Sequence, residues 1–568
     1  MHNFSHRTTF PAIALLLLSG SAAAQSAPDA GSLRQQIEQG QEATLPRKSL
    51  PSKPVAPEAM RPIGGVLAQV TQFKLEGNTL LGAEQIQAVL LPFLHRPLDY
   101  NQLQAATAAV ADAYRAAGWI VRAYLPVQDI VEGVVSIQIV EAVFGGLKFE
   151  SHVSASEKRL NLAQIQRGFD ALQRVGAPLN ADAIDRALLL ADDLPGVAVS
   201  GSLQEGTHAR QTDLLLKLAD EPLVVGEVNL DNTGSRSTGA DRLSANLNLN
   251  SPFGLGDRLG TNLIHTQGSD YVRVGGTLPV GANGWRIGAN VSTMRYQLVA
   301  AEFQALDSKG TSDSTGLEAS YPLLRTRLQN LYFNASLEHK TFDNQANGAT
   351  TTNYRADNLS LGLTGNLFDK LGGGGANSAS LTLTSGKLDL SGSPHQAADA
   401  TSSQTDGSFN KLRYSASRQQ VITDELSFYA VLSGQWASKN LDSSEKLYLG
   451  GASGVRAYPS SEAGGSAGQL LNLELRYRLS RGFNVTAFYD AGQVVVNANN
   501  NGSSALALND YGLKGAGLAL AWQSEAGVNI KASWAQRIGD NPNPTATGAD
   551  QDGSFVNNRF WLNASVPF

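Results

Sequence analysis

One arginine and one aspartate could join two segments that lie far apart in the sequence. Arg456 lies in residues 450–468, a stretch too rich in Gly, Ser and Ala for a helix or a central strand, which predicts a loop. Asp490 lies within the strand-like segment Phe-Tyr-Asp-Ala-Gly, residues 488–492. The planar guanidinium of arginine suits a bidentate contact with a carboxylate. The pair therefore predicts a loop that folds inward and is pinned to a barrel wall; the alternative is two solvated surface charges.

No set of residues predicts catalysis. The chain has 8 His, and within residues 223–568 each of His265, His339 and His395 stands isolated in the sequence. No Ser/His pair with an orienting partner is indicated, and no Walker A motif is present. The chain has no Cys, which excludes thiolate metal sites and cysteine nucleophiles. We expect no enzyme, no metal and no cofactor.

The N-terminus indicates export. Arg7 precedes a short apolar run, residues 12–18, and then three alanines, so residues 1–24 are predicted to be a signal peptide. That run is far too short to cross a bilayer as a helix. The whole chain has 568 residues and a formal net charge of −6, which argues against nucleic acid as a partner.

A helix and a tether are expected next. Leu33 and Ile37, four residues apart among Gln, Arg and Glu, predict a short, mostly polar helix within residues 25–41. Residues 42–66 contain five prolines and predict an extended linker. A polar helix on a long tether can occupy one place and leave it; the alternative is a disordered N-terminal tail.

Two small α/β units then follow one another. Residues 67–143 predict the order β-α-α-β-β, with the longest helix at residues 100–117. The same order returns in residues 144–222, where Asn180 is expected to cap the second helix. Two consecutive units of the same order form an internal repeat.

The pattern changes in residues 223–568. Helical periodicity gives way to segments of about ten residues in which apolar and polar side chains alternate. A soluble β-sandwich also alternates, but it would rarely need so many strands or end on an apolar-face aromatic such as Phe568. We predict a membrane β-barrel of about 16 antiparallel strands with both ends on one side.

At this point the chain resembles the outer-membrane transporters of two-partner secretion, which export filamentous haemagglutinins, haemolysins and contact-dependent toxins. Val455, Arg456 and Tyr458 match the Val-Arg-Gly-Tyr tip of the family's inward-folded loop, with Ala457 in place of the usual Gly. Phe488, Asp490 and Gly492 match the Phe-x-Asp-x-Gly strand that holds this tip. The resemblance covers the whole chain and implies that the two α/β units are POTRA domains.

The resemblance also implies a function. The chain would lie in the bacterial outer membrane with its POTRA domains in the periplasm, and would export one large β-rich exoprotein, an adhesin, cytolysin or toxin. Its other expected partners are outer-membrane lipid and, through Phe568, the barrel-assembly machinery. A barrel-assembly factor of the same superfamily is the alternative; a porin or an outer-membrane hydrolase is a third reading, although a porin would not need residues 67–222.

The same reading predicts how the pore is used. Exposed sheet edges of the POTRA domains would bind an unfolded client by β-augmentation. At rest the lumen would be closed by the helix near residues 29–41, because a polar helix suits a polar lumen, and by the inward loop. Because a lumen is partly hydrated, the contact between Arg456 and Asp490 is expected to contribute more than an exposed ion pair and less than a dry one.

Overall fold

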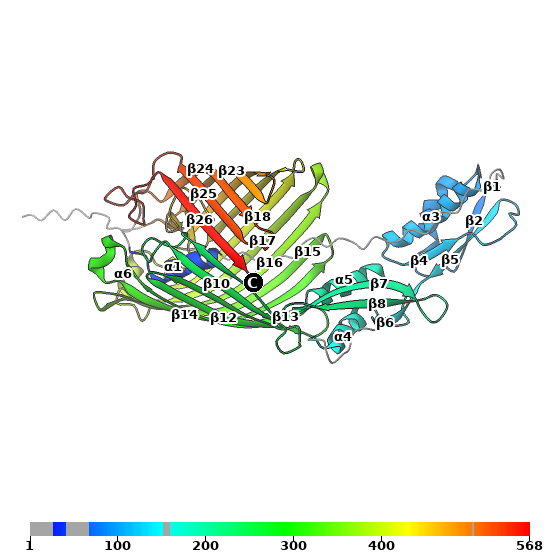
Figure 1. Cartoon of the computed structure of the whole chain (residues 1–568), viewed down its shortest axis with the longest axis horizontal. Coiled ribbons are helices and arrows are strands. Elements are labelled where there is room, and N and C mark those ends of the chain that lie inside the picture. Colours follow the sequence, from blue (N-terminus) through cyan, green and yellow to red (C-terminus); the bar gives the residue numbers. More distant parts are fainter. Residues whose placement is uncertain (1–26, 41–67, 151–159, 502–504) are drawn as a thin grey trace, which may run out of the picture.

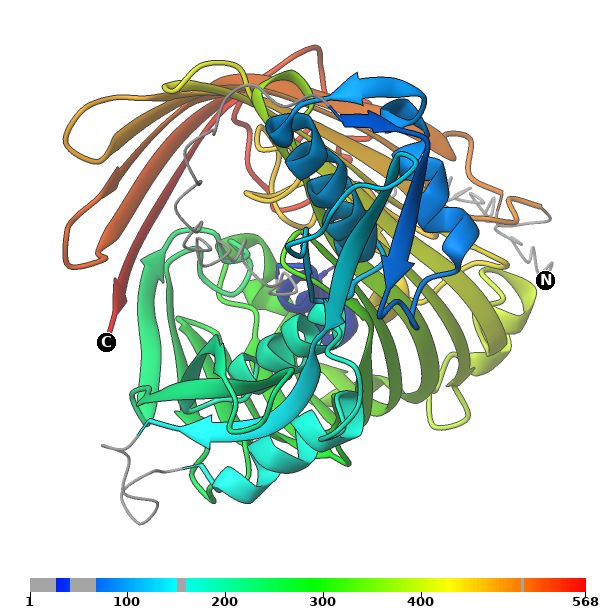
Figure 2. The same ribbon diagram turned by 90° about the vertical axis from the view of Figure 1, so that its right-hand side faces the viewer.

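The structure is a computed structural model that describes residues 27–40, 68–150, 160–501 and 505–568. The predicted signal peptide and the predicted linker, residues 42–66, lie outside the described residues. A β-barrel carries one α/β domain against its mouth and a second one farther out (Figure 1). A helix, α1 (Ala30–Gln39), lies inside the barrel, and a view toward the mouth shows both α/β domains in front of the opening (Figure 2).

The first α/β domain has a three-stranded sheet in the order β2-β5-β4, with β2 and β5 parallel. A small two-stranded sheet of β1 and β3, which the sequence did not predict, precedes the long helix. The elements are β1 (Ala68–Val70), β2 (Gln72–Glu76), α2 (Ala83–Leu90), η1 (Leu91–Phe93), β3 (Arg96–Leu98), α3 (Tyr100–Ala116), β4 (Val121–Tyr124) and β5 (Val134–Glu141).

One carboxylate ties this domain together. Glu141, at the end of β5, accepts hydrogen bonds from the backbone of Thr79 and Leu80 and from the Tyr114 hydroxyl, at 2.6, 2.8 and 3.1 Å. Burial disfavours its charged form, but these hydrogen bonds outweigh burial and lower the pKa of Glu141 below its usual range. The contact fixes the turn after β2 against α3 and β5.

The second α/β domain repeats this plan with its sheet in the order β6-β8-β7, again with one parallel pair. Asn180 caps α5 as expected, because its side chain accepts a hydrogen bond from the backbone of Ala183. β6 begins at Val143, one residue before the boundary expected from the sequence. The elements are β6 (Val143–Phe149), α4 (Leu162–Leu172), α5 (Ala181–Asp192), β7 (Val197–Glu205) and β8 (Gln211–Asp220).

The predicted barrel is confirmed: 16 antiparallel strands close on themselves when β26 pairs with β9. The closing pair joins residues 563–567 of β26 to residues 227–231 of β9. The strands are β9 (Val224–Asp231), β10 (Arg242–Asn250), β11 (Arg258–Thr266), β12 (Ser269–Val280), β13 (Trp285–Gln297), β14 (Lys309–Arg325), β15 (Gln329–Ala346), β16 (Ala349–Asp369), β17 (Gly375–Asp389), β18 (Gly407–Val421), β19 (Leu426–Ala437), β22 (Ala467–Arg478), β23 (Phe483–Val495), β24 (Asp510–Gln523), β25 (Asn529–Arg537) and β26 (Asn558–Pro567).

The outer face of the barrel is apolar. Leu317, Leu337 and Leu359 are register partners on three neighbouring strands, and they are 60%, 54% and 44% exposed. Many other strands carry exposed Leu, Val or Ile at every second position. Contiguous exposed apolar surface of this extent requires a lipid environment. Among the described helices, none is long and apolar enough to cross a membrane.

The connections between strands carry the remaining elements. The longest one, between β19 and β22, folds into the barrel and includes a two-residue strand pair, β20 and β21. The short elements are η2 (Ala301–Leu306), η3 (Leu371–Gly373), α6 (Gln396–Thr401), η4 (Ser443–Glu445), β20 (Leu447–Tyr448) and β21 (Gly464–Gly465).

Candidate functional site

The structure brings Arg456 and Asp490 together in a bidentate contact. The Arg456 Nε and Nη2 atoms donate to the two carboxylate oxygens of Asp490 at 2.9 and 2.7 Å. The Arg456 backbone N–H donates to the same carboxylate at 3.1 Å. Asp490 is 0% exposed and Arg456 is 5% exposed. The contact is therefore drier than expected from the sequence, because the loop itself fills this part of the lumen and excludes water.

Arg456 also has partners that the sequence did not indicate. Its Nη1 atom donates to Glu474 on β22 at 2.7 Å, and its guanidinium lies 3.5 Å from the centre of the Phe488 ring. The indole N–H of Trp561 on β26 donates to the Arg456 carbonyl oxygen at 2.8 Å. The loop tip therefore contacts β22, β23 and the last strand of the barrel. Glu474 and Trp561 fall outside both motifs, so no sequence signal points to them.

The other residues of the two motifs help the loop tip to pack against the barrel wall. Val455 and Tyr458 are buried, and the guanidinium of Arg537 lies 4.2 Å from the centre of the Tyr458 ring. A Cβ at Gly492 would approach Leu449 to 3.0 Å, so the missing side chain there leaves room for the loop. A Cβ at Gly515 on β24 would lie 2.6 Å from the Cβ of Ala457. Glycines of the wall thus allow the loop tip to lie close to the strands.

The connection that folds inward, residues 438–466, begins earlier than the predicted loop, residues 450–468, and ends two residues before it. Gly464 and Gly465 pair with Tyr448 and Leu447, and β22 begins at Ala467. A Cβ at Gly465 would lie 2.3 Å from Val494 on the wall. Gly464 and Gly465 therefore allow the strand pair β20–β21 to pack closely against the barrel wall. Their composition alone had indicated an irregular loop.

A connection near the C-terminus covers the inward loop. Glu462, which is 0% exposed, accepts hydrogen bonds from Asn541 Nδ2 at 3.0 Å and from the Gln551 backbone at 2.9 Å. Asp550 in the same connection pairs with Arg537 at 2.6 Å. The segment between β25 and β26 is thus bound to the loop as well as to the strands.

The helix α1 (Ala30–Gln39) lies in the lumen, within the predicted segment 25–41, whose outermost residues lie outside the described part. Asp29 caps it and accepts a hydrogen bond from the Ser443 hydroxyl at 2.7 Å. Arg34 donates to Ser314 on β14 at 2.6 Å, and Gln35 donates to the Lys446 carbonyl at 3.1 Å. The helix thus bridges the barrel wall and the start of the inward connection.

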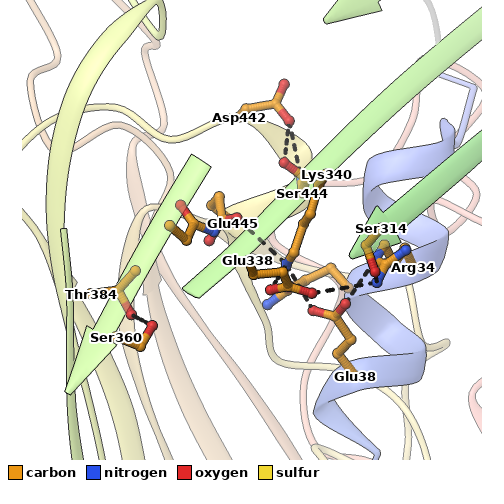
Figure 3. Close-up of polar contacts among 12 residues, drawn as sticks. Arg34, Glu38, Ser314, Glu338, Lys340, Ser360, Thr384, Asp442, Ser444 and Glu445 are labelled. Atoms are coloured by element: carbon orange, nitrogen blue, oxygen red, sulfur yellow. Dashed lines mark hydrogen bonds and ion pairs between the residues drawn. The ribbon is translucent and has the colours of Figure 1, made fainter. Parts of the chain in front are cut away.

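Ion pairs surround the middle of α1 (Figure 3). Glu38 pairs with Arg34 within the helix at 2.7 Å and with Lys340 on β15 at 3.2 Å. Lys340 also lies 3.1 Å from Glu338, and Lys411 pairs with Glu445. If the helix left the wall, Arg34 would still pair with Glu38 and Lys340 would still pair with Glu338.

The apolar face of α1 packs against apolar residues of the barrel wall, whereas the sequence predicted a polar lumen around the whole helix. Leu33 is 5% exposed and packs in a cluster with wall residues of β12, β13, β15, β16 and β17, while Ile37 lies partly buried at its margin. The polar composition of the helix therefore describes only one of its faces.

The rest of the lumen is polar. A cavity of about 620 Å³ lies between α1, the inward loop and the wall. Most of its lining residues are Asn, Ser, Thr, Gln and Gly. Such a surface can solvate the backbone of a passing polypeptide.

The second α/β domain is docked onto the barrel by two arginines that follow β14 or end it. Arg325 makes a bidentate contact with Asp193, with both N–O distances 2.8 Å. Arg327 makes a similar contact with Asp185 on α5 at 2.9 and 2.8 Å. Arg186 donates to the Pro322 carbonyl at 2.7 Å. The end of α5 is thus held at the barrel mouth.

The histidines are less isolated than the sequence suggested. His265 lies 2.6 Å from Asp270, and His339 lies 2.6 Å from Asp357. All four side chains are between 47% and 69% exposed. Among the residues that the structure describes, no group of His, Asp and Glu could hold a metal ion.

Comparison with known proteins identifies the architecture. The family model for haemolysin secretion/activation proteins ShlB/FhaC/HecB matches residues 210–520. The chain belongs to this family. A second model, the ShlB-type POTRA domain, matches residues 68–142. The chain is therefore an outer-membrane transporter of two-partner secretion with its POTRA domains in the periplasm.

Relatives agree with this assignment. The heme/hemopexin transporter protein HuxB of Haemophilus influenzae (strain 86-028NP) is 25% identical, with 97% of each chain covered. The outer membrane transporter CdiB of Dickeya dadantii (strain 3937) is 26% identical over 72% of each chain. The solved structure of CdiB from Escherichia coli has the same fold, with a TM-score of 0.69, 22% identity and coverage of 94% of this chain and 95% of that one. The family is one of transporters.

Proposed function

We propose that this transporter exports one dedicated, large, β-rich exoprotein, an adhesin, cytolysin or toxin, and that α1 and the inward loop close the pore at rest. The observation that carries the proposal is the combination of a polar lumen with two separate occupants, α1 and the loop that carries Arg456. HuxB is named a heme/hemopexin transporter, which adds a haem-acquisition exoprotein to the possible classes of client.

The docked POTRA domain supports a route from periplasm to lumen. The contact between Arg325 and Asp193 places α5 beside the barrel mouth, so a client bound to the sheet edges of β6 or β7 lies next to the opening. An extended client can pair its backbone with such an edge without a particular sequence. Folding of the client outside the cell then supplies the free energy, because an outer membrane has no adjacent pool of ATP.

The membrane and assembly partners follow from the outer face. The apolar band of the barrel contacts outer-membrane lipid. The C-terminal strand β26, followed by Phe568, which is 60% exposed, is the segment that the barrel-assembly machinery would recognise. Residues 1–24 would direct the chain to the periplasm before this step.

The test is reconstitution of export. The chain is expressed in a host that lacks it, together with a candidate large β-rich exoprotein, and the amount of that exoprotein in the culture medium is measured. The full chain should release the exoprotein, and a variant without residues 67–143 should form the barrel but release little. Normal export by that variant would contradict recognition by the first POTRA domain. Lower levels of many other outer-membrane proteins on removal of the full chain would instead indicate an assembly factor.

A further inference from the structure

The inner face of the barrel changes from polar to apolar near its outer end. On β13 the inward residues Asn290 and Ser292 are followed by Met294 and Tyr296. Inward apolar residues also lie near this end on β12, β15, β16 and β17, whereas β14, between β13 and β15, has the inward residue Ser312 there. The residues involved form the wall patch: Tyr271, Met294, Tyr296, Phe342, Tyr354, Ala356, Leu388 and Leu390, all at most 7% exposed.

The wall patch lies at the end of the barrel away from the POTRA domains. Its strands belong to hairpins whose turns lie on that side, such as β15–β16 at residues 347–348. The rings of Phe342 and Tyr354 stack there at 4.6 Å with an interplanar angle of 19°. A chain that crosses the lumen from the periplasm therefore meets the polar wall first and the wall patch last.

In the resting state α1 covers this patch. Ala30 and Leu33 belong to the same cluster, and a Cβ at Gly31 would lie 2.6 Å from the Tyr354 hydroxyl oxygen. The small residues at the start of α1 therefore let the helix lie directly on the aromatic rings. When α1 leaves, the rings become exposed to the lumen, and apolar surface left in water costs about 25 cal/mol per Å².

We propose that the wall patch is a binding surface for the exported polypeptide, which receives apolar side chains of an extended, β-forming segment once α1 has left. The proposal rests on the proposed function. The spacing within the patch supports it: Met294 and Tyr296, or Tyr354 and Ala356, are two positions apart on one strand. Side chains two positions apart on an extended client have the same spacing, roughly 6.6 Å.

The chemistry of the patch also selects the client. An extended β-forming chain presents apolar side chains at alternate positions, together with backbone carbonyls. The rings of the patch accept the side chains, and the Tyr271 hydroxyl, which is buried without a hydrogen-bond partner among the described residues, can donate to a carbonyl. A segment of Gly and Ser would gain only the hydrogen bond.

If the wall patch only holds α1, it should not bind an added apolar peptide once the helix is removed. The test therefore uses the full barrel without residues 25–41, reconstituted in planar bilayers. Two uncharged peptides of equal length are added on the POTRA side, one that alternates Thr and Val and one that alternates Thr and Gly, and the duration of each current block is recorded. The Thr-Val peptide should block for at least tenfold longer, about 1.4 kcal/mol of added binding.

Two substitutions test whether the patch is the cause. Phe342→Thr and Leu388→Thr, each in the barrel without residues 25–41, should shorten the Thr-Val blocks to the duration of the Thr-Gly blocks, whereas Phe342→Leu should preserve them. Heat-modifiable migration shows that each barrel has folded. Equal blocks by both peptides, or no effect of either threonine variant, would overturn the proposal. Loss of export with intact peptide block would instead count against the proposed function.

Discussion

At the scale of single residues, Arg456 is joined to more of the barrel than its pairing with Asp490 requires. The guanidinium contacts two carboxylates and an aromatic ring, and the backbone of the same residue contacts Asp490 and Trp561. Loss of one partner from a buried pair costs roughly 3–5 kcal/mol, because it leaves a buried charge uncompensated. An exposed pair contributes only about 0–1 kcal/mol.

We predict that Arg456→Ala lowers export at least about tenfold while barrel assembly persists, since one lost buried pair exceeds 1.4 kcal/mol. Arg456→Lys should rescue poorly, because an ammonium cannot reproduce the bidentate contact. Asp490→Ala should resemble Arg456→Ala, and the double variant should be little worse than either one, as expected for coupled residues.

The measurement is an export assay with equal amounts of folded barrel. Glu474→Gln is the matched control. Arg456 keeps its ion pair with Asp490 in this variant, so export should fall clearly less than in Arg456→Ala. Normal export by Arg456→Ala, or additive losses in the double variant, would contradict the role of the pair.

At the scale of elements, the apolar contact of α1 should hold it more firmly than its ion pairs do. Without Glu38, Arg34 still lies 3.5 Å from Glu338, and Lys340 keeps Glu338 at 3.1 Å. Without the Leu33 side chain, the wall patch loses a buried leucine of α1 that belongs to the same cluster. Burial of a leucine contributes about 1.5–3 kcal/mol. The ion pairs therefore orient the helix, and Leu33 retains it.

We predict that Leu33→Asn raises the open fraction of single channels by at least about tenfold, and that Glu38→Gln, on the same helix, raises it much less. Planar-bilayer recordings of both variants provide the comparison. Deletion of residues 25–41 should open the channel further and leave export at least partly intact. If Glu38→Gln opened the channel as much as Leu33→Asn, electrostatic retention of the helix would be the better account.

At the scale of the whole molecule, the second POTRA domain is held to the barrel by two unequal contacts. The side chain of Arg325 is 4% exposed and that of Asp193 is 33% exposed, whereas Arg327 and Asp185 are 24% and 46% exposed. The drier contact should contribute more to docking, because water screens the other one.

We predict that Asp193→Asn loosens the second POTRA domain from the barrel and that Asp185→Asn has little effect. The chain has no Cys, so spin labels can be attached at Val175→Cys and Leu371→Cys, two exposed positions on the domain and on a barrel turn. Asp193→Asn should broaden the distance distribution between the labels and reduce export. Equal broadening by both variants would contradict the difference in their burial.

The sequence by itself determined the order of the parts and their types. Alternation at every second residue after residue 223 indicates strands with one face in lipid, and the two β-α-α-β-β patterns indicate paired α/β domains. Arg456 and Asp490 could be paired because both lie within short motifs whose residue types are complementary. The small sheet of β1 and β3 was missed, because three-residue strands carry too little periodicity to predict.

The tertiary structure alone decided what surrounds each of these residues. Glu474 and Trp561 reach Arg456 only because strands far apart in the chain become neighbours around a closed barrel. Leu33 of a mostly polar helix meets an apolar wall because the fold gathers inward apolar residues of five strands at one end of the barrel. Burial depends on which surfaces the fold brings into contact. From composition we expected a partly hydrated pair of Arg456 and Asp490 and polar surroundings for α1. The structure instead buries the pair and places aromatic rings against Leu33.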